Sequence, residues 1–304
     1  MTTKALVLSG GGPVGIAWEC GLIGGLAEAG IDLSAADFFL GTSAGSFVGA
    51  RLAMGTSAAE LAAPFLALSE PAAAGAAPPT PPSTPGGTPP DLAFLMRKMV
   101  EAGAGERPAK DVRAEIGEWA LSRQTMSEEA FIHSFGRFLR ELPADAWPER
   151  DYACTAVDAL DGAFKLWTRD SKVGLAKAVA SSCSVPGVFP PITIQGRPYI
   201  DGGMRSGTNA DMATGYDVVL VIAIRAAGTI GPAAERANKA LQAELKTLED
   251  AGARALVIGP SEASLGALGA NLMDPRRRPA AARAGYEQGK SGVDAEALAT
   301  VWVD

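Results

Sequence analysis

Short apolar runs alternate with longer segments of helical periodicity along most of the chain. Residues 4–8 and 38–40 are apolar enough for buried strands, and each leads directly into a glycine-rich turn. The segments that follow, 16–29 and 46–54, repeat their apolar residues at the spacing of one helix face. Strands that alternate with helices in this way predict an α/β fold with a mostly parallel central sheet.

The same alternation resumes after residue 151. Two β-hairpins are predicted, one turning at Asp161-Gly162 and the other at Gln195-Gly196, because each pair of turn residues separates strand-like runs. Further strands are predicted over 218–224 and 255–258, and helices over 173–182, 233–249 and 278–289.

The segment 56–150 has a different pattern and is predicted to be an inserted helical lobe within a single domain spanning 1–304. Its residues 71–90 are rich in proline and poor in large apolar side chains, which predicts an extended, mobile loop. The helix expected over 91–100 has an apolar face beside two basic residues. Two interpretations stay open for it: a core helix of the lobe, or a lid that contacts acyl chains or a membrane surface.

Composition excludes several classes of protein. The 304 residues are 47% hydrophobic, yet no apolar stretch is long enough to span a membrane, and the first apolar run is too short for a secretory signal. We therefore expect a cytoplasmic protein. The net charge of −7 argues against a nucleic-acid partner. The three cysteines are too far apart in the sequence for a zinc site, so neither metal nor cofactor is expected.

The first glycine-rich turn, Gly10-Gly11-Gly12-Pro13-Val14-Gly15, permits more than one function. Its spacing fits a dinucleotide-binding loop, but that site needs an acidic residue after the second strand, and Asp37 precedes that strand instead. The same loop could aim the backbone N–H groups of Gly10, Gly11 and Gly12 at a developing oxyanion. A plain tight turn is the third interpretation.

The second turn carries a candidate nucleophile. Gly41-Thr42-Ser43-Ala44-Gly45 has the form G-x-S-x-G between a predicted strand and a predicted helix. A nucleophile elbow needs this context and small neighbours such as Gly41 and Gly45, because the serine sits on a sharp turn. An idle serine in an ordinary strand-to-helix turn is the alternative.

A nucleophilic serine needs a base. The chain has one histidine, His133, which the helical pattern places on a solvated face together with Arg137 and Arg140. A carboxylate is therefore the better candidate. Asp201 follows a predicted strand and precedes Gly202-Gly203, so it can lie at the edge of the sheet where substrates bind. A simple Asp-Gly turn without a function is the alternative, and these residues alone favour it.

Taken together, the glycine loop, the Ser43 turn and Asp201-Gly202-Gly203 resemble the patatin-like phospholipase family. The run 180–203, which leads to Asp201, is similar to that family as well, and the likeness covers about residues 4–225. The resemblance implies a three-layer α/β/α fold and a Ser-Asp dyad, with Ser43 as nucleophile and Asp201 as general base. Val14 departs from the pattern, because the family often has a basic residue there, and simpler esters or thioesters stay open as substrates.

Three functions follow as hypotheses. The first is a serine acyl hydrolase that cleaves lipid carboxylic esters of the phospholipase A, lysophospholipase or esterase type. The second is a non-catalytic lipid-binding or regulatory module with the same fold, and the third is a dinucleotide-binding protein. The first hypothesis requires an acyl-ester lipid as substrate and a base that is shielded from solvent. It also allows peripheral contact with a membrane surface.

Overall fold

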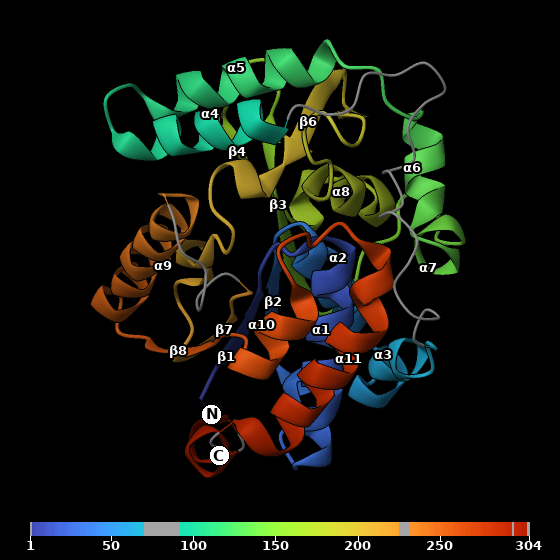
Figure 1. Ribbon diagram of the computed structural model, residues 1–304, viewed down its shortest axis with the longest axis vertical. Helices are drawn as coiled ribbons and strands as arrows, with labels where there is room; N and C mark the ends of the chain where they lie inside the picture. The colour runs from blue at the N-terminus through green and yellow to red at the C-terminus, as the bar shows by residue number, and fades with distance from the viewer. Residues whose placement is uncertain (1, 70–91, 225–231, 294, 303–304) are drawn as a thin grey trace.

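The computed structural model describes residues 2–69, 92–224, 232–293 and 295–302. Its centre is a sheet of eight strands in the order β5-β6-β3-β2-β1-β7-β8, with β4 paired to β3 (Figure 1). The strands are β1 (Lys4–Leu8), β2 (Phe38–Gly41), β3 (Asp151–Asp158), β4 (Phe164–Trp167), β5 (Ile192–Ile194), β6 (Arg197–Asp201), β7 (Val218–Ile222) and β8 (Arg254–Ile258).

Strand pairing confirms the predicted mostly parallel α/β fold. β1, β2, β3, β7 and β8 pair in parallel, whereas β4, β5 and β6 join through antiparallel pairs. Both predicted hairpins are present, as β3–β4 and β5–β6. The carboxyl ends of β1 and β2 lie side by side, with Leu8 opposite Gly41, so the two glycine-rich turns leave the same edge of the sheet.

Helices cover both faces of this sheet. They are α1 (Gly12–Glu28), α2 (Ala44–Ala53), α3 (Ala58–Leu66), α4 (Leu92–Ala104), α5 (Ala109–Leu121), α6 (Glu128–Ser134), α7 (Arg137–Arg140), α8 (Leu175–Ser182), α9 (Pro232–Asp250), α10 (Glu262–Leu268), α11 (Arg278–Glu287) and α12 (Ala295–Trp302). Short 3-10 turns and one π-turn, Gln288–Gly292, complete the described chain.

Successive side chains of the central strands point to opposite faces, and this alternation builds three layers. Leu6 and Leu8 of β1 belong to a core shared with α1, α2 and α8, whereas Val7 belongs to a second core that includes Leu241 of α9. Figure 1 shows α9 on one side of the sheet and α1, α2 and α11 on the other. The three-layer α/β/α architecture expected from the resemblance is therefore confirmed.

Helix α11, in the last part of the chain, packs along α1. The sequence predicts a polar helix here, but Ala281, Ala282 and Gly285 are buried against α1. Helix α11, which begins at Arg278, is far from the motifs in the sequence. It nevertheless lies beside α1, the helix that follows the glycine loop.

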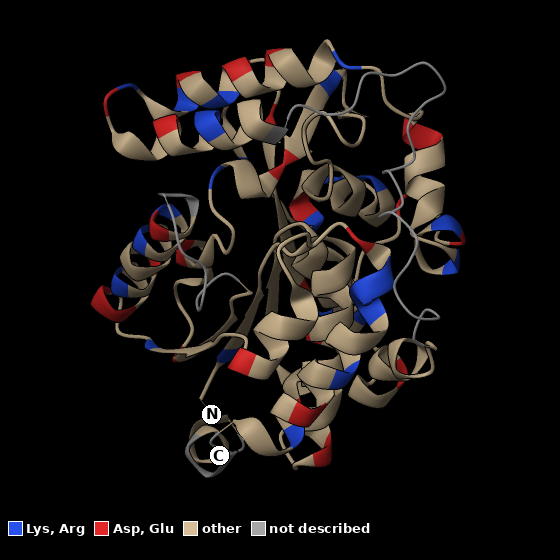
Figure 2. Cartoon of the chain, viewed as in Figure 1, with Lys and Arg blue, Asp and Glu red and all other residues tan. Residues whose placement is uncertain are grey.

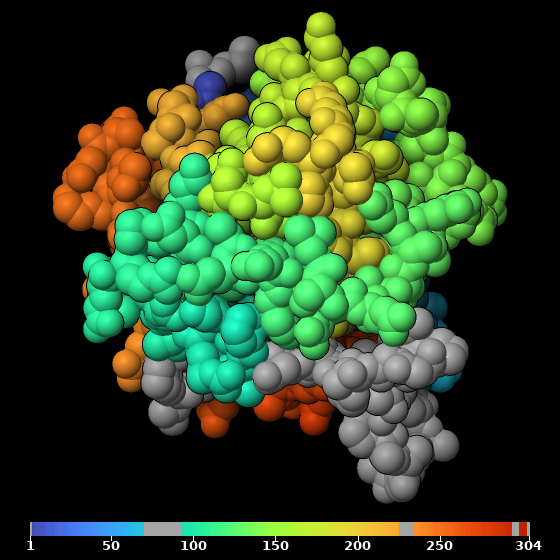
Figure 3. Space-filling view, turned by 90° about the horizontal axis from the view of Figure 1, so that it is seen from above, coloured from blue at the N-terminus to red at the C-terminus, as the bar shows by residue number. Residues whose placement is uncertain are grey.

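The helices of segment 56–150 pack at three separate places around the core. α3 begins with the predicted capping box of Ser57 and Glu60 and packs on α1 and α11. The pair α4–α5 packs against β3 and β6 and forms much of the surface seen in Figure 3, while α6 and α7 pack on α8. The proline-rich residues 71–90 lie outside the described residues.

The predicted helix 91–100 belongs to α4, and its contacts are those of a structural helix. Leu95 is buried in a small core with Ile116 of α5 and Ile200 of β6, and the Phe94 ring lies 4.9 Å from that of Trp119. These contacts tie α4 to α5 and the sheet. Among the helices that the structure describes, none is long and apolar enough to cross a membrane.

Candidate active site

The glycine loop forms the first turn of α1. The helical pattern predicts a start at residue 16, but the helix begins at Gly12, because Pro13 suits a first helical turn. Gly12 itself adopts a φ of +59°, a conformation that favours glycine. A Cβ atom on Gly12 would lie 2.9 Å from the Leu272 carbonyl oxygen. A side chain at this position would therefore force the loop apart.

Only part of the predicted oxyanion loop offers backbone donors. The Gly10 N–H donates to the Gly207 carbonyl at 2.8 Å, so including Gly10 among the oxyanion donors was wrong. Gly10 keeps the site open instead, since a Cβ there would lie 3.3 Å from Ser43 Cβ. The Gly11 and Gly12 amides precede the first helical hydrogen bond, and no described residue accepts from them.

Ser43 occupies a strained turn between β2 and α2. Its φ of 52° and ψ of −119° are costly for a residue with a side chain, and such strain concentrates at functional sites. The turn has no room for larger neighbours: a Cβ on Gly41 would lie 2.3 Å from Ser46 Cα, and one on Gly45 would lie 2.2 Å from the Leu8 carbonyl oxygen. This is the steric environment of a nucleophile elbow.

Asp201 ends β6 and meets Ser43 from the neighbouring part of the sheet. β6 pairs with β3, with Asp201 opposite Ala156, while β3 pairs with the β2 strand that leads to Ser43. The Asp201 side chain is 2% exposed. The Gly203 N–H donates to the Asp201 carboxylate at 2.7 Å, and the Ser43 hydroxyl lies close enough to lower the pKa of that carboxyl. The structure thus brings the two predicted residues together.

Burial changes the acidity of Asp201. Loss of solvent raises its pKa from 3.8 to about 7, and the hydrogen bonds from Ser43 and Gly203 oppose that rise. A base with a pKa near the working pH is far better at accepting a proton than an ordinary aspartate. The shielding that a Ser-Asp pair needs is therefore present around the carboxyl group.

The pH dependence of activity follows from this pKa. Below about pH 7 Asp201 is protonated and cannot accept the Ser43 proton, so kcat/KM should rise with pH through an apparent pKa of about 7. A profile of kcat/KM against pH for a soluble ester measures it. A rising limb near pH 4, the region of an unshifted aspartate, would contradict the assignment of Asp201 as the base.

His133, the alternative base, and Asp37, the acidic residue considered for a dinucleotide site, both lie away from Ser43. His133 is exposed on α6 and is not among the residues that line the pocket beside Ser43. Asp37 lies at the start of β2, where it accepts the Lys4 N–H at 2.7 Å, so it is at the wrong end of the strand for a dinucleotide ribose. Within the described residues, no three His, Cys, Asp or Glu side chains gather as a metal site.

A buried polar network, which the sequence motifs do not reveal, holds the two turns together. Asn209, in the left-handed conformation, donates from Nδ2 to the Ser206 carbonyl at 2.7 Å and to Thr42 Oγ1 at 3.0 Å. The same amide lies 3.4 Å from the Gly202 carbonyl, and Thr42 and Thr155 share a hydrogen bond of 2.9 Å. The residues before Ser43 and after Asp201 are thus tied to one side chain.

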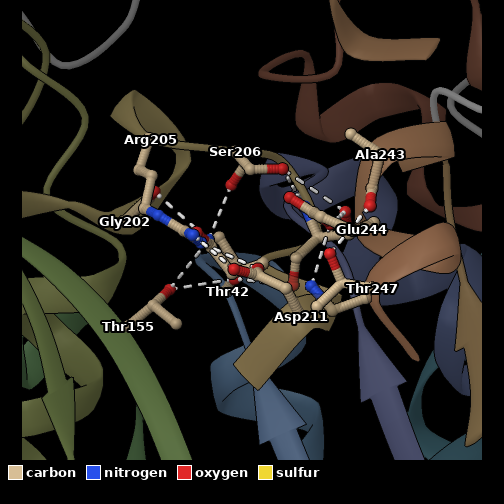
Figure 4. Close-up of polar contacts among 12 residues, drawn as sticks. Thr42, Thr155, Gly202, Arg205, Ser206, Asp211, Ala243, Glu244 and Thr247 are labelled. Atoms are coloured by element: carbon tan, nitrogen blue, oxygen red, sulfur yellow. Dashed lines mark hydrogen bonds and ion pairs between the residues drawn. The ribbon is translucent and has the colours of Figure 1, made fainter. Parts of the chain in front are cut away.

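The network continues toward α9. Figure 4 shows Glu244 of α9 on one side and Arg205 with Asp211 on the other. Glu244 accepts hydrogen bonds from the Thr208 hydroxyl and from the Ala210 N–H, and Arg205 donates to Asn209 Oδ1 at 2.8 Å. Fully paired buried polar groups of this kind fix local geometry.

A pocket of about 420 Å³ opens beside the nucleophile. Of Ser43 and Asp201, only Ser43 lines it. Its wall is mainly aromatic and aliphatic, and it includes Phe47, Phe65, Phe131, Phe135, Phe189, Ile16, Pro64, Val185 and Met273. Phe131 stacks on Phe189 with ring centroids 4.3 Å apart. The pocket is suited to an apolar chain that ends at the serine.

The site and fold have a counterpart among known families. The model of the patatin-like phospholipase family matches residues 6–214, which is most of the chain. The chain therefore belongs to the patatin-like phospholipase family, a family of lipid acyl hydrolases. No curated protein matches it significantly.

Comparison with solved structures finds VipD and ExoU among the matches. VipD from Legionella pneumophila is 16% identical with a TM-score of 0.46, and the type III effector protein ExoU is 17% identical with a TM-score of 0.35. Each comparison covers 95% of this chain but only 66% of VipD and 53% of ExoU. The chain thus spans only part of the length of either protein.

Proposed function

We propose that the protein is a serine acyl hydrolase that cleaves carboxylic esters of lipids with a Ser43–Asp201 dyad. The observation that carries this proposal is the juxtaposition of a strained Ser43, which lines an apolar pocket, with a buried Asp201 carboxyl whose pKa its hydroxyl lowers. A strained serine, a base with a pKa of about 7 and free amides at a helix N-terminus are the parts that acyl transfer needs.

In this mechanism the acyl chain lies in the aromatic pocket with its carbonyl at Ser43. Asp201 accepts the Ser43 proton as Ser43 Oγ attacks the carbonyl carbon, and the negative charge on the carbonyl oxygen is stabilised by the Gly11 and Gly12 amides and by the N-terminus of α1. Collapse of the intermediate transfers the proton to the departing alcohol. Water then attacks the acyl-enzyme with Asp201 again as base, which releases the acid.

Substrate class and metal independence can be tested together. Purified protein should hydrolyse acyl esters of lipid-like chains, with EDTA causing less than about a twofold loss, because the proposed chemistry uses only protein groups. A panel of p-nitrophenyl esters, phospholipids, lysophospholipids and acyl thioesters, each with and without EDTA, ranks the substrates. Strict dependence on calcium, or no turnover of any ester, would contradict the proposal.

A further inference from the structure

The pocket follows two neighbouring helices away from the nucleophile. Ser43, Phe47 and Arg51 are spaced four residues apart, so they lie on one face of α2, and all three line the pocket. Gly12 and Ile16 line it from the matching face of α1. The pocket therefore begins at the helix N-termini, and the backbone of Arg51 lies about two helical turns, or about 12 Å, along α2 from Ser43.

Arg51 has no anionic partner at this place. Its guanidinium lies 6.0 Å from the centroid of the Phe138 ring, and its Nε atom is buried without a hydrogen-bond partner. The nearby Glu60 feels the charge of Arg51, but its carboxylate is held by the Ser57 hydroxyl and N–H at 2.8 and 3.0 Å. Arg51 forms no ion pair with a described residue.

Arg278 reaches the same pocket from α11. Its guanidinium lies 5.1 Å from the centroid of the Phe65 ring, and its Nε atom is likewise buried without a partner. Figure 2 shows basic residues gathered where α11 begins. Both guanidinium groups lower the pKa of the Cys20 thiol against the larger effect of burial, which places them around one side chain of α1.

Partial burial of two guanidinium groups without an anionic partner costs desolvation free energy. A bound anion offsets this cost, because a guanidinium donates paired hydrogen bonds to phosphate or carboxylate oxygens. The glycine loop itself adds no charge to the pocket, because its Val14 is apolar and fully buried. The positive charge in this pocket therefore comes from α2 and α11 instead.

We propose that Arg51 and Arg278 form an anion subsite in the acyl pocket, away from the nucleophile, which selects esters carrying a phosphate or carboxylate group in addition to the scissile ester. The inference rests on the proposed ester hydrolysis at Ser43. The anion belongs either to the end of the acyl chain or to the alcohol part of the ester. Both sources present the same oxygen atoms to the two guanidinium groups.

Two matched substrate pairs distinguish the sources. The first compares p-nitrophenyl decanoate with the mono-p-nitrophenyl ester of decanedioic acid, and the second compares monodecanoylglycerol with the matching lysophosphatidic acid. The measured quantity is the ratio of kcat/KM for the anionic ester to that for the neutral ester. We expect the wild-type ratio to exceed about tenfold in one pair, since hydrogen bonds to charged groups contribute that much or more.

Arg51→Gln and Arg278→Gln should each lower this ratio by about tenfold, and the ratio cancels any general loss of activity. Arg254→Gln is the matched control, because Arg254 is an exposed arginine at the start of β8, remote from the pocket residues. A wild-type ratio near one in both pairs would overturn the proposal. So would a ratio that neither pocket variant changes.

A binding measurement separates this inference from the proposed catalysis. Decyl phosphate should bind wild type at least about tenfold more tightly than decanol in calorimetric titration, and Arg51→Gln and Arg278→Gln should remove that difference. If no ester is hydrolysed but this preference is found, the anion subsite stands and the catalytic proposal fails. Equal binding of the two amphiphiles would refute the subsite whatever the outcome of the activity assays.

Discussion

Ser43→Ala is expected to lower ester hydrolysis by about 10⁴-fold or more while the protein stays folded. Without the hydroxyl no acyl-enzyme can form, and loss of a nucleophile that acts with its base removes most of the catalysis at once. The Cβ of alanine occupies the same place in the turn as that of serine, so no new clash is introduced. Initial rates on a soluble p-nitrophenyl ester, with circular dichroism as the check on folding, measure the effect.

Ser291→Ala is the matched control for that variant, because Ser291 is exposed and its hydroxyl donates only to the Glu287 carbonyl of its own turn. It should hydrolyse the ester at the wild-type rate. Retention of more than about a tenth of the activity in Ser43→Ala would mean that another group performs the attack, and the acyl-enzyme mechanism would have to be abandoned.

Asp201→Asn should lower kcat by about 10³-fold or more, because an amide cannot accept the Ser43 proton. The same variant should be more stable than wild type at pH 8. The folded-state pKa of Asp201 is raised from 3.8 to about 7, so the wild-type protein loses stability as pH rises across that interval, by about 4 kcal/mol once the group is ionised in both states. Asparagine stays neutral and avoids this loss.

Thermal unfolding of both proteins at pH 4 and pH 8 checks the sign of the stability change. The gain in Tm from Asp201→Asn should appear at pH 8 and shrink toward zero at pH 4, where the wild-type carboxyl is largely protonated in the folded state.

His133→Ala should leave activity unchanged, because His133 is exposed and is not among the residues that line the pocket. A large loss of kcat in His133→Ala with little loss in Asp201→Asn would transfer the role of base to the histidine.

Local patterns in the sequence were sufficient for the strands and for singling out Ser43 and Asp201, the proposed catalytic pair. The apolar runs ending at Leu8 and Leu40 are short and end at glycines, which is typical of buried strands, and the glycines allow turns at one edge of the sheet. Asp201 was found because its hydrophobic strand and following glycines predict a bend at the same edge. These signals come from neighbouring residues, so the strands and turns can be predicted without knowledge of tertiary contacts.

Features that depend on distant contacts were missed. Gly10 was placed among the oxyanion donors because nothing nearby in sequence shows that Gly207 accepts its N–H. Arg278 enters the pocket only because α11 packs along α1, and Asn209 becomes a link between the two turns only when β6 lies beside β3. Arg51 did have a local signal, its spacing of eight residues from Ser43 on one helix face.

The most direct test of the central claim is covalent labelling of Ser43 by a fluorophosphonate probe, followed by intact mass and peptide mapping. A fluorophosphonate reacts with a serine whose hydroxyl is activated by a nearby base. The proposed dyad predicts a single adduct, on Ser43, that forms readily at pH 8, is strongly slowed in Asp201→Asn and is absent from Ser43→Ala. An unlabelled wild-type protein, or an adduct on a serine other than Ser43, would contradict the account.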